Sequence, residues 1–345
     1  MIRLIPFLLI IFIIILIYLI FKKNVKSQKN FLKISFIILF VFLAIRGEST
    51  GTDLPNYHFF YDLLSYYNIK DLLKSNYFEI GYTLYSYIIH LISNGNFRFF
   101  LVVTAFFSLI GIYDFIKRYS KNYLLSIIVY ICLQYYLFIF SGLRQGIALS
   151  IVCFSIRFIV QRKFWKFLCL VCIATTFHLS ALIFLPAYFL SEYDINDKKL
   201  FFAIGLIIII YIFRYNIVYL FASLFFSNYS LNDNFGNGYS LLVIYFVIFI
   251  FISIFKRNFL GKEELKLNNI CYNYLYIGIL IQVLATVEGN AHRATFYYLI
   301  TILCTIPKIS LIFSSKDKLL VNIILIILLI IYFILISGNL VYKIF

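Results

Sequence analysis

Charged residues are scarce in this chain of 345 residues. Asp, Glu, Lys and Arg make up 13% of it, whereas 63% of its residues are hydrophobic. A soluble globular domain is about one quarter charged and about half apolar. The shortage of charge excludes a soluble domain, and the length leaves room for about ten or more apolar spans of about 20 residues each. We therefore expect an all-α polytopic membrane protein that forms a single membrane domain over residues 1–345.

Motifs for cofactors and metals are also missing. The sequence has no glycine-rich phosphate loop, and the segments expected outside have no Asp-x-Asp pair and no His/Glu cluster with metal spacing. All six cysteines lie within apolar runs, and Cys169-x-x-Cys172 has no second pair beside it. We expect buried thiols rather than a metal or redox site. The sequence thus predicts an activity that needs no cofactor and no metal.

Basic residues outnumber acidic residues by 30 to 14, but this excess does not indicate a nucleic-acid partner. Lys and Arg form short clusters between apolar runs, as they do where charge sets the orientation of a membrane protein. Most clusters fall on the cytoplasmic side if the segment 79–93 dips into the membrane and returns, as a re-entrant or interfacial segment. If that segment crossed, the later clusters would face outward, against the positive-inside rule. Both termini are then expected outside.

We predict about twelve spanning helices, within a range of about 10 to 13. The first apolar stretch is followed, not preceded, by a basic cluster, so we expect a retained helix rather than a cleaved signal peptide. The stretch 164–190 is expected to break near His178, with a further kink at Pro186. The predicted spans are approximately 4–21, 31–45, 97–116, 123–140, 143–160, 164–177, 178–190, 200–213, 239–255, 270–287, 294–312 and 319–338.

Two connecting segments are long enough to form structure outside the membrane. The first, 46–78, has turn residues at Gly47, Gly51 and Pro55, and its part 57–74 mixes aromatic, aliphatic and charged residues. We expect a helix there that lies in the membrane interface. The second external loop is expected over residues 214–238, which are rich in Asn, Tyr and Ser.

Three arginines, Arg46, Arg144 and Arg293, stand at external ends of apolar helices. Inserting a charge deep in a span costs roughly 2.5–3.5 kcal/mol on insertion scales. The position of each arginine therefore requires an interaction that offsets this cost. One such interaction is contact of the arginine side chain with lipid headgroups. We favour a shared anionic site, because a guanidinium donates two parallel hydrogen bonds to phosphate and stays charged. Such a site would stabilise a diphosphate leaving group without a divalent cation.

Three residues are candidates for a general base towards a sugar hydroxyl: Asp53, His178 and Glu288. Each has a structural alternative. Asp53 suits a turn or helix cap, His178 a hydrogen-bonded buried position, and Glu288 an ion pair with Arg293. The sequence does not choose among them. Tyr57, Gln145 and His292 stand beside these charged residues and are expected to contact the substrate, although His292 also suits an interfacial position.

Five short motifs, in this order, resemble the EpsG/Wzy family of bacterial polysaccharide polymerases. Leu54 and Ile80 stand where the family often has Tyr and Pro, and these departures leave the charged residues untouched. The motifs are Gly-Thr-Asp-Leu-Pro-Asn-Tyr at 51–57, Glu-Ile-Gly-Tyr at 79–82, Gly-Leu-Arg-Gln-Gly-Ile-Ala at 142–148, Phe-His-Leu-Ser-Ala-Leu-Ile at 177–183, and Arg293 with Tyr297 and Tyr298.

The resemblance implies a glycosyltransferase with a glycosyltransferase-C-like membrane architecture in the bacterial cytoplasmic (inner) membrane. It would move the growing glycan from undecaprenyl diphosphate to an incoming lipid-linked repeat unit at the outer face. Arg144 and Arg293 would hold the donor diphosphate, with Arg46 assisting. The implied partners are the lipid-linked donor and acceptor, membrane lipids and, as a further partner to be considered, a chain-length regulator.

Two alternatives remain open from the sequence. A lipid-linked oligosaccharide flippase or transporter would also need cationic residues, but such proteins often have two related halves, and no internal repeat is visible. An O-antigen ligase-type transferase is close in chemistry, but its large external loop usually lies late in the chain, where segment 214–238 is only of moderate length.

Overall fold

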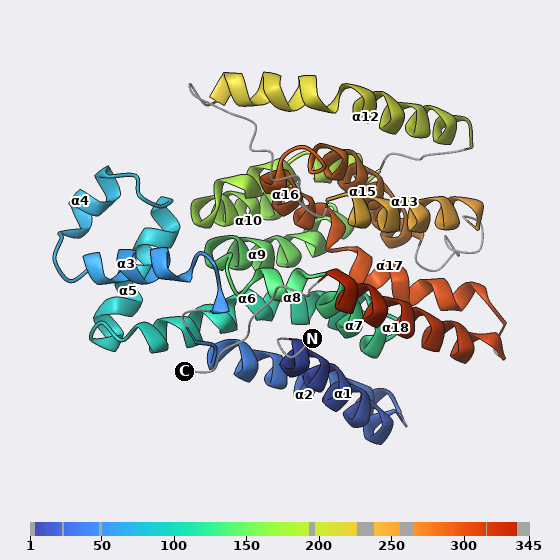
Figure 1. Ribbon diagram of the computed structural model, residues 1–345, viewed down its shortest axis with the longest axis horizontal. Coiled ribbons are helices and arrows are strands. Elements are labelled where there is room, and N and C mark those ends of the chain that lie inside the picture. The colour runs from blue at the N-terminus through green and yellow to red at the C-terminus, as the bar shows by residue number, and fades with distance from the viewer. Residues whose placement is uncertain are drawn as a thin grey trace. The chain divides into compact units, whose positions relative to one another are not determined.

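The computed structural model describes residues 4–22, 24–47, 50–192, 197–225, 238–255, 265–314 and 316–336. These residues form helices and connecting turns and contain no strand (Figure 1). The expected all-α class is thereby confirmed. It follows from the composition, because a backbone in lipid must satisfy its own hydrogen bonds and a helix does so within one segment.

Six of the described helices are long and apolar enough to cross a membrane, and a seventh candidate is a pair bent by 58°, α16 (Gly289–Leu299) and α17 (Ile302–Ile309). Further apolar helices are shorter. The six are α2 (Val25–Ala44), α6 (Phe97–Tyr119), α9 (Leu143–Val160), α12 (Asp197–Phe225), α15 (Leu265–Leu284) and α18 (Asp317–Ile336). The shorter elements include α1 (Ile5–Phe21), α7 (Tyr123–Cys132), α10 (Phe164–Phe177), Leu179–Leu190 and α13 (Gly238–Ile254).

Each of the twelve segments predicted to span overlaps one of these elements or pairs. The predicted span 123–140 is interrupted, because α7 ends at Cys132 and the short helix α8 (Tyr135–Phe138) follows Gln134, whose φ is 68°. Length and composition support six to seven spans. The shorter helices have 10–17 residues, at or below the lower end of the range of about 17–25 residues for a transmembrane helix. The count of about twelve therefore stays a prediction.

The contacts divide the chain into two compact units, and the expected single membrane domain over residues 1–345 stays a prediction. The first unit comprises residues 1–182 and 323–345, and the second comprises residues 183–322. In the first unit, α9 packs between α6 and α10, α6 also contacts α2, and α1 packs on α2. Gly111 on α6 donates its backbone N–H to Ser150 Oγ on α9 at 2.8 Å, which ties these two helices together.

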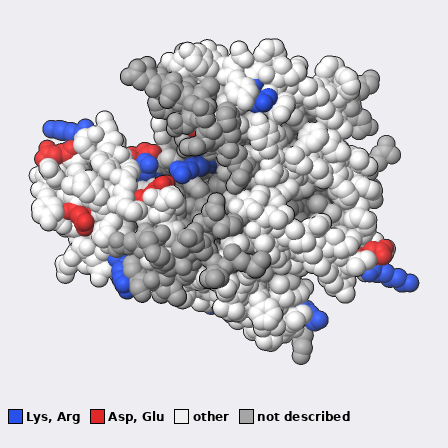
Figure 2. Space-filling model, in the orientation of Figure 1, with Lys and Arg blue, Asp and Glu red and all other residues white. Residues whose placement is uncertain are grey.

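A lobe of three short helices stands at one end of α6, α9 and α10 within the first unit (Figure 1). Its helices are α3 (Leu54–Leu63), α4 (Ile69–Lys74) and α5 (Ile80–Ser93). On the face drawn in Figure 2, acidic and basic side chains gather over this lobe. The expected helix within 57–74 is thus formed as parts of α3 and α4, and its place in the membrane interface stays a prediction.

In the second unit, α15 is the central helix, with α12, α13 and α16 packed against it. Its polar side chains bond to neighbouring helices. The Tyr274 hydroxyl donates to the Ala187 carbonyl at 2.9 Å, and the Tyr276 hydroxyl donates to the Ala203 carbonyl at 3.3 Å. Asn268 accepts a hydrogen bond from the buried Lys308 ammonium at 2.5 Å. These bonds satisfy polar groups that apolar surroundings would otherwise penalise.

The helical break near His178 is confirmed. α10 ends at Phe177, His178 has an extended backbone with φ −155° and ψ 118°, and a 3₁₀ turn, Leu179–Phe184, follows. Pro186 then precedes the short helix α11 (Ala187–Leu190), as expected from its fixed φ. Backbone geometry thus turns the chain sharply at His178, which matters for the site described below.

Two further predictions, one of a helix boundary and one of cysteine burial, differ from the structure. Helix α12 continues past Arg214 to Phe225, so the first part of the predicted loop 214–238 is helical, and residues 226–237 lie outside the described residues. Arg214 bonds back to the Tyr211 carbonyl at 2.6 Å and lies over the Tyr211 ring, so the charge does not end the helix. Among the cysteines, Cys169 and Cys172 are exposed rather than buried, because they lie on the outer side of α10.

Candidate active site

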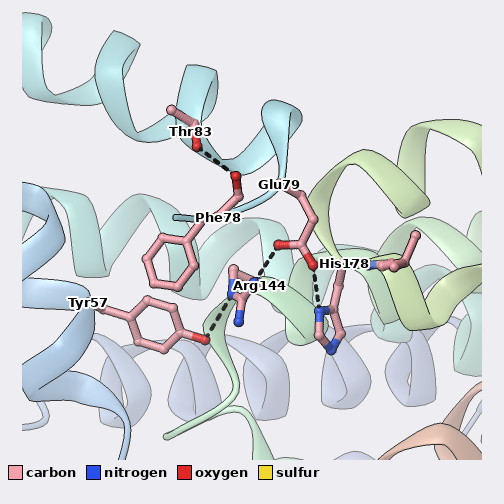
Figure 3. Close-up of polar contacts among 7 residues, drawn as sticks. Tyr57, Phe78, Glu79, Thr83, Arg144 and His178 are labelled. Atoms are coloured by element: carbon pink, nitrogen blue, oxygen red, sulfur yellow. Dashed lines mark hydrogen bonds and ion pairs between the residues drawn. The ribbon is translucent and has the colours of Figure 1, made fainter. Parts of the chain in front are cut away.

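Arg144, in the first turn of α9, is held by the lobe of α3 to α5. Its Nη1 forms an ion pair with Glu79 Oε2, and its Nε donates to the Tyr57 hydroxyl at 3.5 Å (Figure 3). The guanidinium lies over the Phe78 ring, 4.3 Å from its centroid. Its other terminal nitrogen, Nη2, has no hydrogen-bond partner among the described residues. Arg144 is thus fixed on three sides and retains donors for a further anion.

Glu79 precedes α5 and joins two of the predicted site residues. Besides Arg144 on Oε2, its Oε1 accepts the Leu179 backbone N–H at 3.1 Å and lies 3.1 Å from His178 Nδ1. Burial alone would raise the pKa of Glu79, but the hydrogen bond with His178, the charge of Arg144 and the Leu179 amide together lower that pKa to about 2. Glu79 is therefore a carboxylate throughout the neutral range and a poor proton acceptor.

His178 caps the end of α10 with its ring turned towards Glu79. An ionised carboxylate beside Nδ1 accepts a hydrogen bond, so in the neutral ring the proton sits on Nδ1. Nε2 then carries the lone pair, and no described residue bonds to it. A carboxylate that orients an imidazole in this way is a recurrent arrangement in general-base catalysis.

The two segments that supply these residues approach closely at a glycine. A Cβ on Gly81 would lie 2.2 Å from Thr176 Oγ1 and 2.9 Å from the Thr176 carbonyl oxygen. Only glycine allows α5 to pack this tightly on the end of α10. The motif at 79–82 and the motif at 177–183 therefore meet because Gly81 has no side chain.

A third motif holds the turn before α9. Thr52 donates its backbone N–H to Ser141 Oγ at 3.0 Å, and its hydroxyl donates to Asp53 Oδ1 at 3.1 Å. Asp53 occupies the N-cap position of α3 without a side-chain capping bond, one helical turn before Tyr57. The motifs at 51–57, 79–82 and 142–148, and residues 177–182 of the fourth motif, are thus joined by hydrogen bonds or close packing within the first unit.

Arg46 and Gln145 do not face this site. The Arg46 side chain is 0% exposed, donates to the Leu43 carbonyl at 2.6 Å and lies over the Phe140 ring at 5.7 Å. It would have to leave this buried position to touch a diphosphate, so the geometry gives no support to a direct contact. Gln145 follows Arg144 in sequence but is 3% exposed, on the packed side of α9. Tyr57, by contrast, contacts Arg144 as expected.

The remaining predicted residues belong to the second unit. His292 Nδ1 lies 2.9 Å from Gln282 Oε1, and Gln282 Nε2 donates to the Gly238 carbonyl at 2.9 Å. His292 therefore takes part in a packed network between helices. Glu288 and Arg293 flank it, both partly buried. A site shared by Arg293 with Arg144 stays a prediction, as does an ion pair between Glu288 and Arg293.

A cavity of about 470 Å³ opens beside Arg144. It lies between the turn that precedes α5 and the end of α10, and Glu79 and Arg144 form its charged wall. Its lining residues are Asn76, Tyr77, Phe78, Glu79, Ile80, Arg144, Thr175, Thr176 and Leu179. Volumes of roughly 300–1,000 Å³ are usual for small-ligand sites.

Glu79 is the residue of this cluster that sequence reasoning did not select as a site residue. The sequence contains two features that could have identified it: Glu79 opens one of the five motifs, and it is an isolated acid directly before an apolar helix. In the part of the chain that the structure describes, no group of three or more His, Cys, Asp or Glu side chains could hold a metal ion. The predicted independence from metal remains untested by that observation.

The model of one protein family, described as the EpsG family, matches residues 29–343. The chain belongs to the EpsG family. The match covers nearly the whole chain, and the family is a Wzy-type polysaccharide polymerase family, so the resemblance seen in the five motifs is confirmed. Family membership and the apolar helices together support a membrane protein with a role in polysaccharide polymerisation. Neither the curated proteins nor the solved structures contain a match to the chain.

Proposed function

We propose that this EpsG-family protein polymerises lipid-linked repeat units at the outer face of the cytoplasmic membrane. It transfers the growing glycan from undecaprenyl diphosphate to a hydroxyl of an incoming lipid-linked unit. The observation that carries the proposal is the Glu79-centred cluster, in which one carboxylate holds both Arg144 and His178. The family supplies the reaction class, and the cluster supplies a cation and a base for it.

Arg144 is the proposed ligand of the donor diphosphate. Its Nη2 has no hydrogen-bond partner among the described residues and can donate to a phosphate oxygen, while Phe78 and Tyr57 fix the plane of the guanidinium. As the bond between sugar C1 and the diphosphate oxygen breaks, its electron pair leaves with the diphosphate. A fixed guanidinium stabilises that developing charge without reorganising. Arg293 lies in the second unit, and its contact with the diphosphate stays a prediction from the sequence.

His178 is the proposed base. The acceptor hydroxyl oxygen forms the new bond to C1, and its proton passes to His178 Nε2. Glu79 stabilises the imidazolium that results, because the carboxylate remains ionised. Asp53 and Glu288 were equal candidates from the sequence. His178 is preferred over them because it has a bonded carboxylate partner on Nδ1 and a lone pair on Nε2.

The phenotype of cells that lack the protein distinguishes the candidate functions. Loss of a polymerase leaves surface glycan that carries one repeat unit, whereas loss of a flippase leaves none and loss of a ligase leaves the glycan on its lipid carrier. We expect the single-unit phenotype, restored to long chains by the wild-type gene. A deletion strain that still makes long chains would refute the proposal.

The same strain tests Arg144. Arg144→Ala should fail to restore long chains at wild-type membrane levels, and Arg144→Lys should restore them poorly, because lysine lacks the planar fork. Arg98→Ala is the matched control, since Arg98 is exposed in the first turn of α6 and is not among the residues that line the cavity. Full activity of Arg144→Ala would remove Arg144 from the donor site.

A further inference from the structure

The cavity beside Arg144 has the chemistry of a sugar subsite. Aromatic rings of Tyr77 and Phe78 stand in its lining together with the amide of Asn76 and the hydroxyls of Thr175 and Thr176. A sugar ring has C–H faces that pack on an aromatic ring and a rim of hydroxyls that need polar partners. An aromatic surface with a few placed polar groups meets both needs.

Another cavity of the same unit shows the contrast. It has a volume of about 350 Å³ and is lined by Phe36, Ile37, Phe40, Phe106, Leu109 and Ile110, with Lys33 and Tyr113 at its polar parts. Its almost continuous apolar wall suits a lipid chain. The cavity beside Arg144 carries an ion pair and the side chains of Asn76, Thr175 and Thr176 instead. The two threonine hydroxyls donate to carbonyls of their own helix at 2.8 Å, so each oxygen can still accept a hydrogen bond from a sugar hydroxyl. A hydrocarbon chain would use none of this hydrogen-bonding capacity.

Tyr77 is held rigidly at the edge of this cavity. Its hydroxyl donates to Asn56 Oδ1 at 2.5 Å, and its ring stacks on Phe60 at 5.2 Å and meets Phe78 edge-on at 4.9 Å. Phe60 belongs to the buried core of the lobe, so the Tyr77 ring packs against a side chain that is itself fixed. Tyr77 nevertheless remains 38% exposed, which leaves part of its ring open to a ligand. A platform fixed in advance loses little entropy when a ligand binds.

The position of Arg144 determines which sugar would lie there. If Arg144 binds the diphosphate, the neighbouring cavity receives the unit bonded to that diphosphate. We propose that this cavity is the subsite for the sugar directly attached to the lipid diphosphate, with Tyr77 as its stacking platform. This inference rests on the proposed function and adds to it a residue that determines substrate specificity.

The test measures binding and turnover separately, using the full-length protein in nanodiscs. The probes are a synthetic undecaprenyl-diphosphate-linked repeat unit and undecaprenyl diphosphate without sugar. Tyr77→Ala should weaken binding of the glycosylated lipid about tenfold, while Tyr77→Phe, which keeps the ring, should stay within about threefold of the wild type. Tyr66→Ala is the control, because Tyr66 is 81% exposed and does not line the cavity.

The sugar-free lipid separates the subsite from the fold and from the diphosphate site. Tyr77→Ala should bind it as the wild type does, which also shows that the variant is folded, whereas Arg144→Ala should bind both lipids weakly. Equal losses for both lipids in Tyr77→Ala, or no loss for the glycosylated one, would overturn the subsite. If the wild type binds the glycosylated lipid but makes no polymer, the proposed function fails while the binding comparison still decides on Tyr77.

Discussion

At the scale of single residues, the Glu79 carboxylate joins the other residues of the candidate site. Its two carboxylate oxygens serve Arg144, His178 and the Leu179 amide at once, and its side chain is only 21% exposed. A buried carboxylate is costly unless it is paired and hydrogen-bonded, and Glu79 is both. Glu79 lines the proposed sugar subsite, but it exchanges no proton and forms no bond with the substrate in the proposed reaction. It acts through Arg144 and His178, as a positioning residue.

Replacing Glu79 by glutamine tests this role. Glu79→Gln keeps the shape and an acceptor oxygen but loses the charge that stabilises an imidazolium at His178. We expect the rate of polymer formation at saturating substrate to fall by about 100-fold or more, the usual scale for general-base catalysis. Asp62→Asn, at an exposed acid of α3, is the control and should leave the rate unchanged. Wild-type rates in Glu79→Gln would refute the role.

The depressed pKa of Glu79 predicts how its contribution to stability varies with pH. The pKa lies at about 2 in the folded protein, below the ordinary value of 4.5. Such a group stabilises the fold above about pH 4.5, and the stabilisation disappears as the pH falls towards 2. The thermal midpoint of the wild type should therefore exceed that of Glu79→Gln at pH 6, and the gap should narrow below pH 4.5. A gap that is constant from pH 6 to pH 3 would contradict the assignment.

At the scale of helices, the approach of α5 to α10 decides whether the site forms. Gly81→Ala would place a methyl group against the Thr176 hydroxyl and carbonyl, and overpacking of this kind costs about 1–3 kcal/mol. We expect a lower thermal midpoint and loss of polymer. Gly205→Ala on α12 is the matched control, because nothing lies within 4 Å of the added Cβ. Full activity and unchanged stability of Gly81→Ala would show that the helices can separate without consequence.

Much of the helical layout could be predicted from hydrophobicity and turn residues. The break at His178 was predicted because the downstream basic clusters require the stretch 164–190 to return to the side on which it begins, and the structure confirms the break. The end of α12 could not be predicted from Arg214, since that charge is satisfied by its own helix and the apolar run continues. The burial of the Arg46 side chain could not be predicted either, because a sequence does not tell whether an arginine at a helix end turns outward or packs against a ring.

Three residues of the candidate site were predicted from sequence motifs, and the fourth, Glu79, was identified only from the structure. Arg144, His178 and Tyr57 were selected from the sequence, and the structure brings them together. The link through Glu79 could not be predicted, because residues 79, 144 and 178 are far apart in the chain and a helix–helix contact sets their separation. The choice among three bases likewise depended on which residue has an oriented partner.

At the scale of the whole molecule, the positive-inside rule predicts the orientation. The lobe of α3 to α5 should face outward, and the connection between α9 and α10 should face the cytoplasm. In a background with Cys169→Ser and Cys172→Ser, which removes the exposed thiols, Tyr66→Cys should react with a membrane-impermeant maleimide in intact cells. Gln161→Cys, at the exposed end of α9, should react only after permeabilisation. The opposite pattern would place the candidate site on the wrong side of the membrane.

The cluster of Glu79, Arg144 and His178 is proposed to join lipid-linked repeat units. The most direct measurement supplies a synthetic lipid-linked repeat unit to the purified protein and separates the products by length. We expect a ladder of products from the wild type and from Arg98→Ala, and no product longer than the starting unit from Arg144→Ala at equal protein concentration. A ladder of normal length and amount from Arg144→Ala would contradict the proposal.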